Sequence, residues 1–339
     1  MKIFVTGGAG YIGSATAATF IAAGHEVVVF DNLSRGHREA VPEDAAFVQG
    51  DMLDRAALDA AFETHRPDAV AHFAGFIEAA ESMQQPGMYL HNNLTGAIHL
   101  LEAMITHQCT QMVFSSTAAV YASKNAPLNE DDPFGPSNLY GDTKLMIERM
   151  LGWYHRIHGL KYAALRYFNA GGAMLNGDAQ AVRGEAHQPE SHLIPLTLQV
   201  PLGQRDKIEL YGIDYPTPDG TCVRDYVHIE DLASAHVLAL AALDDASEPL
   251  VYNLGNGRGY SNREVIETAR AVTGHPVPVE ETDRRPGDAT VLVASAEKVN
   301  HELGWVPKYP DLKDIISSAW EWHRSHPHGY MSKTGGDNE

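Results

Sequence analysis

The sequence predicts an α/β fold in which a doubly wound parallel sheet is followed by a smaller, mixed α/β domain. Three observations predict it. Short apolar, β-branched runs alternate with helix-length stretches in the first half of the chain. A glycine-rich turn joins the first of these runs to the first helix-length stretch. Beyond about residue 170, the alternation gives way to a loop-rich region with many prolines.

Six strands are expected in the first half. They lie at Ile3–Thr6, Val27–Phe30, Ala46–Gln49, Ala69–Phe73, Gln111–Ser115 and Tyr162–Arg166. A helix is expected over Leu94–Ile105, because its apolar residues recur at the spacing of one helix face. Strands that alternate with helices need right-handed crossovers, and these produce a parallel sheet with helices on both faces.

The domain boundaries follow from where this alternation stops and resumes. Residues 1–170 form the first domain. Parts of 225–255 are expected to join it, because a long helix (about Ile229 to Leu243) and a strand (Leu250–Leu254) occur there. Residues 171–325 form the second domain, and residues 326–339 form a polar tail.

Composition excludes several classes of function. The 44 Asp and Glu residues outnumber the 25 Lys and Arg residues, and the net charge of −19 argues against a nucleic-acid partner or an anionic membrane surface. Two cysteines, Cys109 and Cys222, are too few for a disulfide framework or a multi-cysteine metal site. No apolar run is long enough for a signal peptide or a membrane span, so a cytoplasmic location is expected.

The glycine-rich turn predicts a dinucleotide site of the Rossmann type. Gly7, Gly10 and Gly13 follow the first strand and open the first helix, where they allow a tight turn, close approach to a pyrophosphate and close helix packing. The phosphates then meet the free amides at the positive end of the helix. The alternative is an ordinary turn between a strand and a helix.

Two acidic residues at strand ends bear on which cofactor binds. Asp31 ends the second strand, where a carboxylate accepts ribose hydroxyls and repels a 2′-phosphate, so NAD is favoured over NADP. Arg35 is the counter-argument, since it could pair with that phosphate, but a solvated loop charge is the preferred interpretation. Asp51 ends the third strand and either caps the next helix or bonds the adenine amine.

A second motif carries the chemistry. Tyr140 and Lys144 are four residues apart, so on a helix their side chains share one face. The hydroxyl residues Ser115, Ser116 and Thr117 end the fifth strand and would lie beside them. Together with the Gly-x-x-Gly-x-x-Gly turn, this arrangement resembles the extended short-chain dehydrogenase/reductase family. A surface helix with a half-buried tyrosine is the alternative.

The residue types suit proton transfer from a sugar hydroxyl. A free tyrosine titrates near ~10, so lowering its pKa by about three units requires a preference of ~4 kcal/mol for phenolate. The Lys144 ammonium and a cationic nicotinamide ring could supply it together, while Thr117 bonds the same sugar oxygen. Lyases that resemble this fold carry acids directly after the Ser/Thr, and here Ala118 and Ala119 stand there, which disfavours elimination. Neither cysteine lies in a motif for a further oxidation.

Further stretches resemble the UDP-galactose 4-epimerases of that family, from Lys2 to about Gly329. The most specific is Asp-Tyr-Pro-Thr-Pro-Asp-Gly-Thr at 214–221. Departures are Ile77, where epimerases often carry a lysine near the cofactor, and Ala122 in place of a usual glycine. The resemblance implies an NAD site formed by Gly7, Gly10, Tyr11, Ile12, Gly13, Asp31, Asn32, Asp51, Met52, Phe73, Ala74, Gly75, Asn92, Tyr140 and Lys144. It implies a UDP-sugar site formed by Thr117, Tyr140, Asn169, His192, Arg224, Arg285, Asp288 and Leu292.

Three of these residues have an alternative reading. A diphosphate needs about two guanidinium clamps, which Arg224 and Arg285 would supply, but each could instead pair with its neighbour, Asp225 or Asp288. The resemblance places Leu292 beside C2 of the sugar, where a tyrosine closes the pocket to an N-acetyl group and a small residue opens it; it could also be a core strand residue. No two histidines have a metal spacing, so no metal is expected.

The predicted function is NAD-dependent epimerisation at C4 of a UDP-hexose, UDP-galactose to UDP-glucose, through a transient 4-keto sugar. Alternatives are another nucleotide sugar (a UDP-N-acetylhexosamine, UDP-pentose or UDP-hexuronate), a dehydratase, or an NAD sensor, which would typically have lost Tyr140 or Lys144. The resemblance also implies a homodimer through Leu94–Ile105 and the helix after Tyr140. That helix carries Met146, Met150 and Trp153, which are more apolar residues than one face of the sheet should cover. Internal packing of both faces is the alternative.

Overall fold

The computed structural model describes residues 1–124, 126–285 and 289–330. Its first part is a seven-stranded sheet in the order β12-β6-β5-β4-β1-β2-β3, and every pair in it is parallel. The strands are β1 (Lys2–Thr6), β2 (Glu26–Asp31), β3 (Ala46–Gln49), β4 (Ala69–His72), β5 (Gln111–Thr117), β6 (Lys161–Tyr167) and β12 (Leu250–Leu254). The predicted doubly wound parallel sheet is confirmed.

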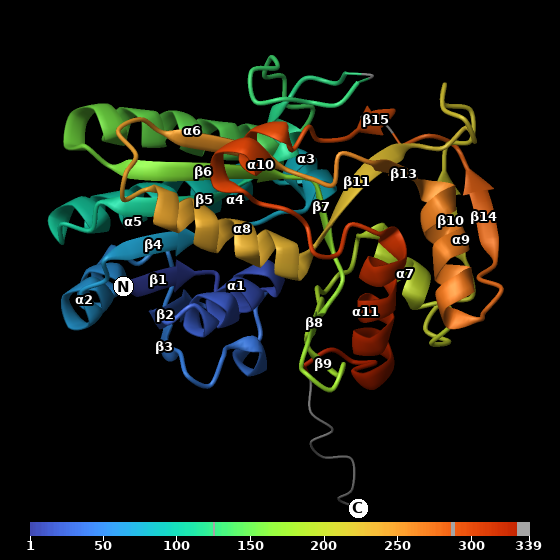
Figure 1. The fold of residues 1–339 in the computed structure, drawn as a ribbon, viewed down its shortest axis with the longest axis horizontal. Coiled ribbons are helices and arrows are strands. Elements are labelled where there is room, and N and C mark those ends of the chain that lie inside the picture. Colours follow the sequence, from blue (N-terminus) through green and yellow to red (C-terminus); the bar gives the residue numbers. More distant parts are fainter. Residues whose placement is uncertain (125, 286–288, 331–339) are drawn as a thin grey trace, which may run out of the picture.

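Helices cover both faces of this sheet (Figure 1). One face packs against α2 (Arg55–His65), α5 (Gly96–Thr106) and α6 (Leu139–His158) in a core that includes Leu58, Leu100 and Ile147. The opposite face packs against α1 (Tyr11–Ala22), α8 (Ile229–Ala242) and α10 (Glu297–Leu303) in a core that includes Ala17, Leu232 and Val299. The near-continuous apolar runs of β1, β4, β5 and β6 fit this arrangement, because these inner strands are buried on both sides, whereas the edge strand β3 is partly exposed.

The connections include short elements. They are η1 (Arg38–Ala40), α3 (Ala79–Gln84), α4 (Pro86–Tyr89), the π-helical turn η2 (Leu90–Thr95) and η3 (Ala118–Val120). The predicted helix over Leu94–Ile105 therefore begins inside η2 and continues as α5. Strand β5 runs on to Thr117, and β4 ends at His72, so the expected boundaries there were off by one or two residues.

The rest of the chain builds smaller sheets beside the carboxyl edge of the large one (Figure 1). Strand β11 (Val223–His228) pairs with β7 (Asn169–Gly171), β13 (Gly259–Ser261) and β15 (Val291–Leu292). Two further pairs are β8 (Met174–Leu175) with β9 (Ala181–Arg183) and β10 (Ile208–Tyr211) with β14 (Val279–Thr282). Helices α7 (Leu193–Leu198), α9 (Asn262–Thr273) and α11 (Leu312–Ser325) pack around a core with Ile194, Val265 and Ile315.

The beginning of the predicted polar tail is packed rather than loose. The Tyr330 hydroxyl accepts a hydrogen bond from the Gly184 amide at 3.1 Å, and its ring lies 4.7 Å from the ring of Trp322. The segment after α11 therefore packs against the buried Trp322. Residues 331–339 of the predicted tail lie outside the described residues.

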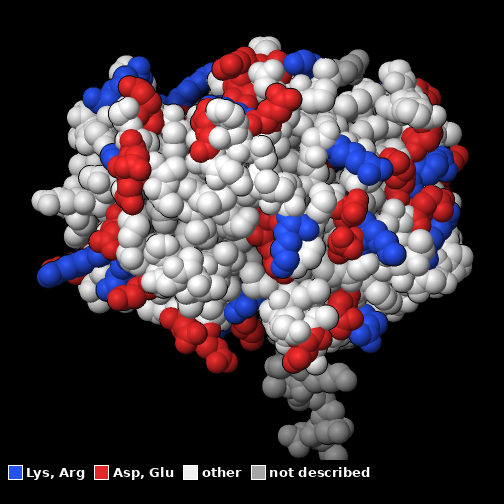
Figure 2. Space-filling model, in the orientation of Figure 1, with Lys and Arg blue, Asp and Glu red and all other residues white. Residues whose placement is uncertain are grey.

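Charged side chains of both signs lie on the surface. Figure 2 shows Lys and Arg interspersed with Asp and Glu on the visible face, with no area where basic side chains alone gather. Among the described residues, no helix combines the length and the apolar composition that crossing a bilayer requires.

Candidate active site

A cavity of about 360 Å³ lies at the carboxyl edge of the large sheet. Parallel strands end there together, so residues that are far apart in sequence meet at this edge. The cavity brings together twenty of the predicted site residues. They are Gly7, Gly10, Tyr11, Ile12, Gly13, Asp31, Asn32, Asp51, Met52, Phe73, Ala74, Gly75, Asn92, Thr117, Tyr140, Lys144, Asn169, His192, Arg224 and Leu292.

The glycine-rich turn has the geometry of a phosphate cradle. Gly7 has φ +71°, a conformation that favours glycine, and its amide donates to the Phe30 carbonyl at 3.0 Å. Gly10 is the N-cap of α1 and offers no side-chain cap, so the amides of the first helical turn are left for a ligand. A dinucleotide pyrophosphate fits these donors and the room that the missing side chains leave.

Asp31 closes this turn from the second strand. Its carboxylate accepts from the amides of Ala9 at 3.0 Å and Leu33 at 2.8 Å, and it is buried. Burial raises the pKa of Asp31, although the two amides oppose that effect. Arg35 lies 3.5 Å from Glu81 and donates to the Gln188 carbonyl at 2.9 Å, so other partners already engage this guanidinium.

Asp51 does not cap the helix that follows it. The N-cap of α2 is Asp54, whose side chain accepts from the Ala57 amide at 3.0 Å, so the capping hypothesis for Asp51 is wrong. Asp51 instead accepts from the Leu53 amide at 2.8 Å and from the Asn32 side chain at 2.9 Å. Both side chains are thereby held at the cavity wall.

Helix α6 and strand β5 position the three residues that were predicted to transfer the proton. Asn138 caps α6 by accepting from the Gly141 amide at 2.9 Å, so Tyr140 lies in the first turn and Lys144 one turn later. The Lys144 ammonium donates to the Ser115 carbonyl of β5 at 2.9 Å. Thr117, the last residue of β5, hydrogen-bonds the Tyr140 phenol. The predicted group of three is therefore assembled in the cavity.

Burial sets the protonation of these groups. It raises the pKa of Tyr140 to about 12, an effect that the Thr117 hydrogen bond opposes and Glu78 reinforces. Burial also lowers the pKa of Lys144 to about 8, because the ammonium has lost its contact with water. The phenol is thus neutral at pH 7 with these residues alone, and a further positive charge beside it would favour phenolate.

The residues expected to bind the UDP-sugar divide into two groups. Asn169 and Arg224 line the cavity, and Arg224 donates to the Ala289 carbonyl at 2.7 Å. Arg285 lies outside the cavity lining and is exposed, with its guanidinium 3.8 Å from the centre of the Tyr211 ring. The structure thus does not bring Arg285 to the cavity, and Asp288 lies outside the described residues.

Asp225, the neighbour considered as an ion-pair partner for Arg224, instead binds backbone amides. The Asp225 carboxylate is fully buried and accepts from the amides of Asn256, Gly257 and Ala294 at 2.9–3.2 Å. Burial raises the pKa of Asp225 to about 7, and the amides oppose that effect. This carboxylate therefore ties loops together behind the cavity.

Leu292 lies between the cavity and a small core cluster. It lines the cavity, and it packs against a small core cluster that contains Val120, Leu128 and Leu145. Strand β15 places it opposite Arg224 of β11. Its side chain is half-buried, so a larger residue there would project into the cavity.

Sequence reasoning missed several residues of this region. Tyr167 lines the cavity, and its hydroxyl contacts that of Ser115. Behind Thr117, Ser116 donates to Glu148 at 2.5 Å, and Glu148 pairs with Arg166 at 2.6 Å. Ser116 and Arg166 are polar residues in two buried strands, where they are register partners. Polar residues in strands that are otherwise apolar were the signal in the sequence that could have indicated this buried contact.

The cavity also contains Glu185 and His187, which sequence reasoning did not select. With Glu190 they surround His192. Burial alone would lower the pKa of His192, but Glu185 and Glu190 overcome it and raise the pKa well above the ordinary value. This cluster falls in a loop of irregular spacing, where no periodic pattern signals which side chains meet.

Comparisons with known proteins agree with this geometry. The NAD dependent epimerase/dehydratase family matches residues 3–255. The chain belongs to this family. The predicted resemblance is therefore confirmed at the level of the family and of the fold.

Relatives of this epimerase/dehydratase chain match nearly all of its length. It is 50% identical to a UDP-glucose 4-epimerase of Halalkalibacterium halodurans, with 98% of each chain covered. A solved UDP-glucose 4-epimerase from Brucella ovis in complex with NAD matches with a TM-score of 0.89 and 44% identity, over 94% of this chain and 97% of the other. One from Bifidobacterium longum in complex with NAD+ and UDP matches with a TM-score of 0.91 and 35% identity, over 97% of this chain and 100% of the other.

Proposed function

We propose that this epimerase/dehydratase chain is an NAD-dependent UDP-glucose 4-epimerase that interconverts UDP-galactose and UDP-glucose. The observation that carries the proposal is that Thr117, Tyr140 and Lys144 share one cavity with the glycine-rich turn. Full-length identity of 50% to a UDP-glucose 4-epimerase supports the choice of reaction. Both cysteines are free and buried, which fits action in the reducing cytoplasm.

The chain's own residues account for the proton chemistry. Tyr140 takes the proton of the sugar C4 hydroxyl and returns it later, while Thr117 hydrogen-bonds the same oxygen. The Lys144 ammonium stabilises the phenolate from one turn away. When bound, NAD+ supplies a hydride acceptor and a positive charge. That charge favours the phenolate and so opposes the burial that raises the pKa of Tyr140.

Residues Ala118 and Ala119 favour isomerisation over water loss. They directly follow Thr117 in the turn η3 and carry no group that could protonate a departing hydroxyl. The sugar therefore keeps all its atoms through the cycle. Arg224 lies on the same cavity and suits the diphosphate of the UDP-sugar, while Asn169 and His192 lie where they could contact the nucleotide sugar.

A product assay tests the proposed reaction. Purified protein is incubated with UDP-galactose and no added NAD, and the products are followed by NMR. UDP-glucose is expected. Products of water loss would identify a lyase instead, and an unchanged sugar in protein that retains NAD would indicate a protein that only senses NAD.

We expect NAD, and not NADP, to copurify with the protein. Asp31 occupies the end of β2 with a carboxylate that repels a 2′-phosphate, and Arg35 is engaged with Glu81 and Gln188. A cycle that returns its hydride does not need to release the cofactor. Heat-denatured protein should release NAD in near-stoichiometric amount, measured by enzymatic cycling. Release of NADP would show that Arg35 decides the specificity.

We also expect a homodimer through α5 and α6. Ile98 on α5 and Trp153 and Ile157 on α6 are 42%, 58% and 66% exposed, although they are large and apolar. Light scattering should give twice the 36.9 kDa chain mass, and Ile98→Glu with Ile157→Glu should give a monomer. Val306→Glu changes an equally exposed valine elsewhere and should leave the dimer intact. A wild-type monomer at micromolar concentration would contradict this.

Substrate breadth should depend on Leu292. A leucine leaves more room beside the cavity than a tyrosine but offers an acetamide no hydrogen bond, so discrimination of only ~1–3 kcal/mol is expected. Wild-type protein should turn over UDP-N-acetylglucosamine slowly, and Leu292→Tyr should abolish this while sparing UDP-galactose. If the tyrosine variant handles both sugars as the wild type does, Leu292 is not the gate.

A further inference from the structure

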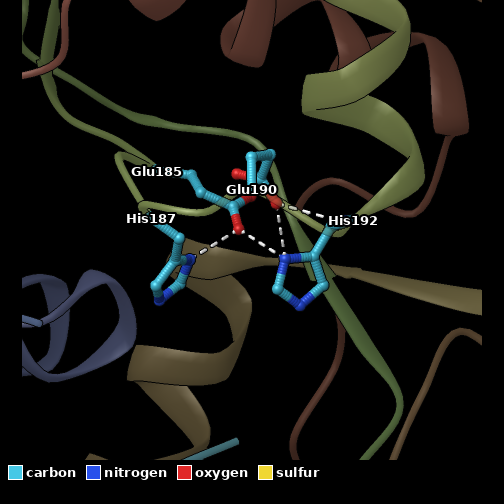
Figure 3. Close-up of side chains that lie close together, drawn as sticks. All are labelled: Glu185, His187, Glu190 and His192. Carbon is cyan, nitrogen blue, oxygen red and sulfur yellow. Dashed lines mark hydrogen bonds and ion pairs between the residues drawn. The ribbon is translucent and has the colours of Figure 1, made fainter. Parts of the chain in front are cut away.

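Two glutamates and two histidines, Glu185, His187, Glu190 and His192, converge on one another (Figure 3). Glu185 Oε1 lies 2.8 Å from His187 Nδ1 and 2.9 Å from His192 Nδ1. Glu190 Oε1 lies 2.9 Å from the same His192 Nδ1. All four potential ligand atoms lie within 4.8 Å of one another. Figure 3 shows both Nδ1 atoms turned toward the carboxylates.

The distances between these atoms cover the range of ligand-to-ligand distances found around a small metal ion. Zinc lies about 2.0–2.2 Å from nitrogen and oxygen ligands, so the ligands of a tetrahedral site lie roughly 3.3–3.6 Å apart. The closest atoms of the cluster would need to separate by about 0.5 Å to admit an ion. Side-chain rotations of that size need no change in the backbone.

The donor set selects a class of ion. Neutral imidazole suits zinc and its neighbours in the first transition series, whereas magnesium and calcium are bound by oxygen ligands alone. Two imidazoles with two carboxylates therefore favour a divalent ion such as Zn²⁺. The charges match as well, because a divalent cation neutralises two glutamates whose side chains are only 6% and 8% exposed.

The loop that supplies these ligands is fixed from several sides. The buried Trp322 indole donates to the Glu185 carbonyl at 2.8 Å, and Arg35 donates to the Gln188 carbonyl at 2.9 Å. The Glu190 carboxylate itself accepts from the amides of Ser191 and His192, both at 2.7 Å. The carboxylates are thus oriented before any ion arrives, which lowers the cost of binding.

We propose that Glu185, His187, Glu190 and His192 form a binding site for one divalent transition-metal ion of the zinc class. Three of these residues line the cavity, so the ion lies in its wall. It ties the segment 184–192 together where that segment borders the cavity. The ion is not needed for proton transfer by Tyr140, so this site adds to the proposed function.

Zinc titration of the whole protein tests the site. The purified chain is stripped with EDTA, desalted and titrated with ZnCl2 by isothermal calorimetry, and bound zinc is counted by mass spectrometry after gel filtration. We expect one Zn²⁺ per chain with micromolar or tighter affinity, and slower amide exchange across 184–192. Cobalt in its place should give the visible absorption of a four-coordinate site.

Variants separate this site from other histidines. His187→Ala and Glu190→Gln should each weaken zinc binding by at least about tenfold. Glu190→Gln keeps the size of the side chain, so it remains informative if the histidine variant folds poorly. His107→Ala is the matched control, because His107 lies 3.3 Å from a single carboxylate, that of Asp59; it should bind zinc as the wild type does.

Two results would overturn the proposal. Folded wild-type protein that takes up no zinc would mean that protons on the two imidazoles neutralise the glutamates. Zinc bound equally well by the wild type and both cluster variants would mean that it sits elsewhere. Neither result depends on epimerase activity, so failure of the metal site is distinguishable from failure of the proposed reaction.

Discussion

Replacing Tyr140 by phenylalanine should lower the turnover of UDP-galactose by about 10²–10⁴-fold or more while leaving NAD bound. The change removes one oxygen atom from a half-buried ring and adds nothing. The helix cap at Asn138 and the Lys144 contact with Ser115 do not involve that oxygen. Turnover measured at saturating substrate, together with released NAD, therefore isolates the chemical role of the phenol.

The size of the effect follows from the surroundings of the phenol. Burial raises the pKa of Tyr140 to about 12, and the hydrogen bond from Thr117 is the local contact that favours phenolate. Lys144 reaches the same region as an ammonium held on the Ser115 carbonyl. Without the phenol oxygen, these groups have no base to act on, and water in its place would be a far weaker one.

Tyr154→Phe is the matched control for this prediction. Tyr154 lies on the same helix, and its hydroxyl contacts Glu102 on α5, away from the cavity lining. It should retain activity within a few-fold of the wild type. A Tyr140→Phe protein that keeps NAD and more than a tenth of wild-type activity would show that another group removes the proton.

Local patterns explain why the sequence could predict the centre of the site. The Gly7–Gly13 turn and the spacing of Tyr140 and Lys144 are each contained in one strand–helix unit. The parallel sheet then requires their carboxyl-edge ends to meet Thr117. The roles of these residues came from the family resemblance, and sheet topology explains why they meet.

Other residues depended on contacts that no local pattern encodes. Arg285 follows β14 and stacks on Tyr211 of the neighbouring β10, a contact made by tertiary packing. Glu185 and His192 meet because the loop between β9 and α7 folds back, and its spacing is neither 2 nor 3.6 residues. The packing of Tyr330 likewise depends on the distant Gly184.

Replacing Gly13 by alanine should leave the purified protein without NAD and lower its activity by about 100-fold or more. A Cβ at this position would lie 2.2 Å from the Gly7 carbonyl oxygen and 2.9 Å from its carbonyl carbon. Ordinary contact would require α1 and the turn to separate by roughly 1 Å, and a displacement of that size is enough to misplace bound groups.

The turn cannot move aside to relieve this clash. The Gly7 amide is bonded to the Phe30 carbonyl, and the Gly7 carbonyl accepts from the Gly10 amide at 3.1 Å. On its other side the turn touches the segment that follows β4, because a Cβ on Gly7 would lie 2.6 Å from the Ala74 amide nitrogen. The strain therefore falls on α1, whose N-terminal amides are the proposed phosphate donors.

Gly87→Ala provides the control, since a Cβ there meets nothing within 4 Å and the residue lies in α4. That variant should keep its NAD, because alanine fits a helix at least as well as glycine does. NAD released on denaturation and the melting temperature distinguish the two variants. If Gly13→Ala kept stoichiometric NAD, α1 would have shifted without loss of the phosphate contacts, and the close approach of helix and turn would not be what the cofactor requires.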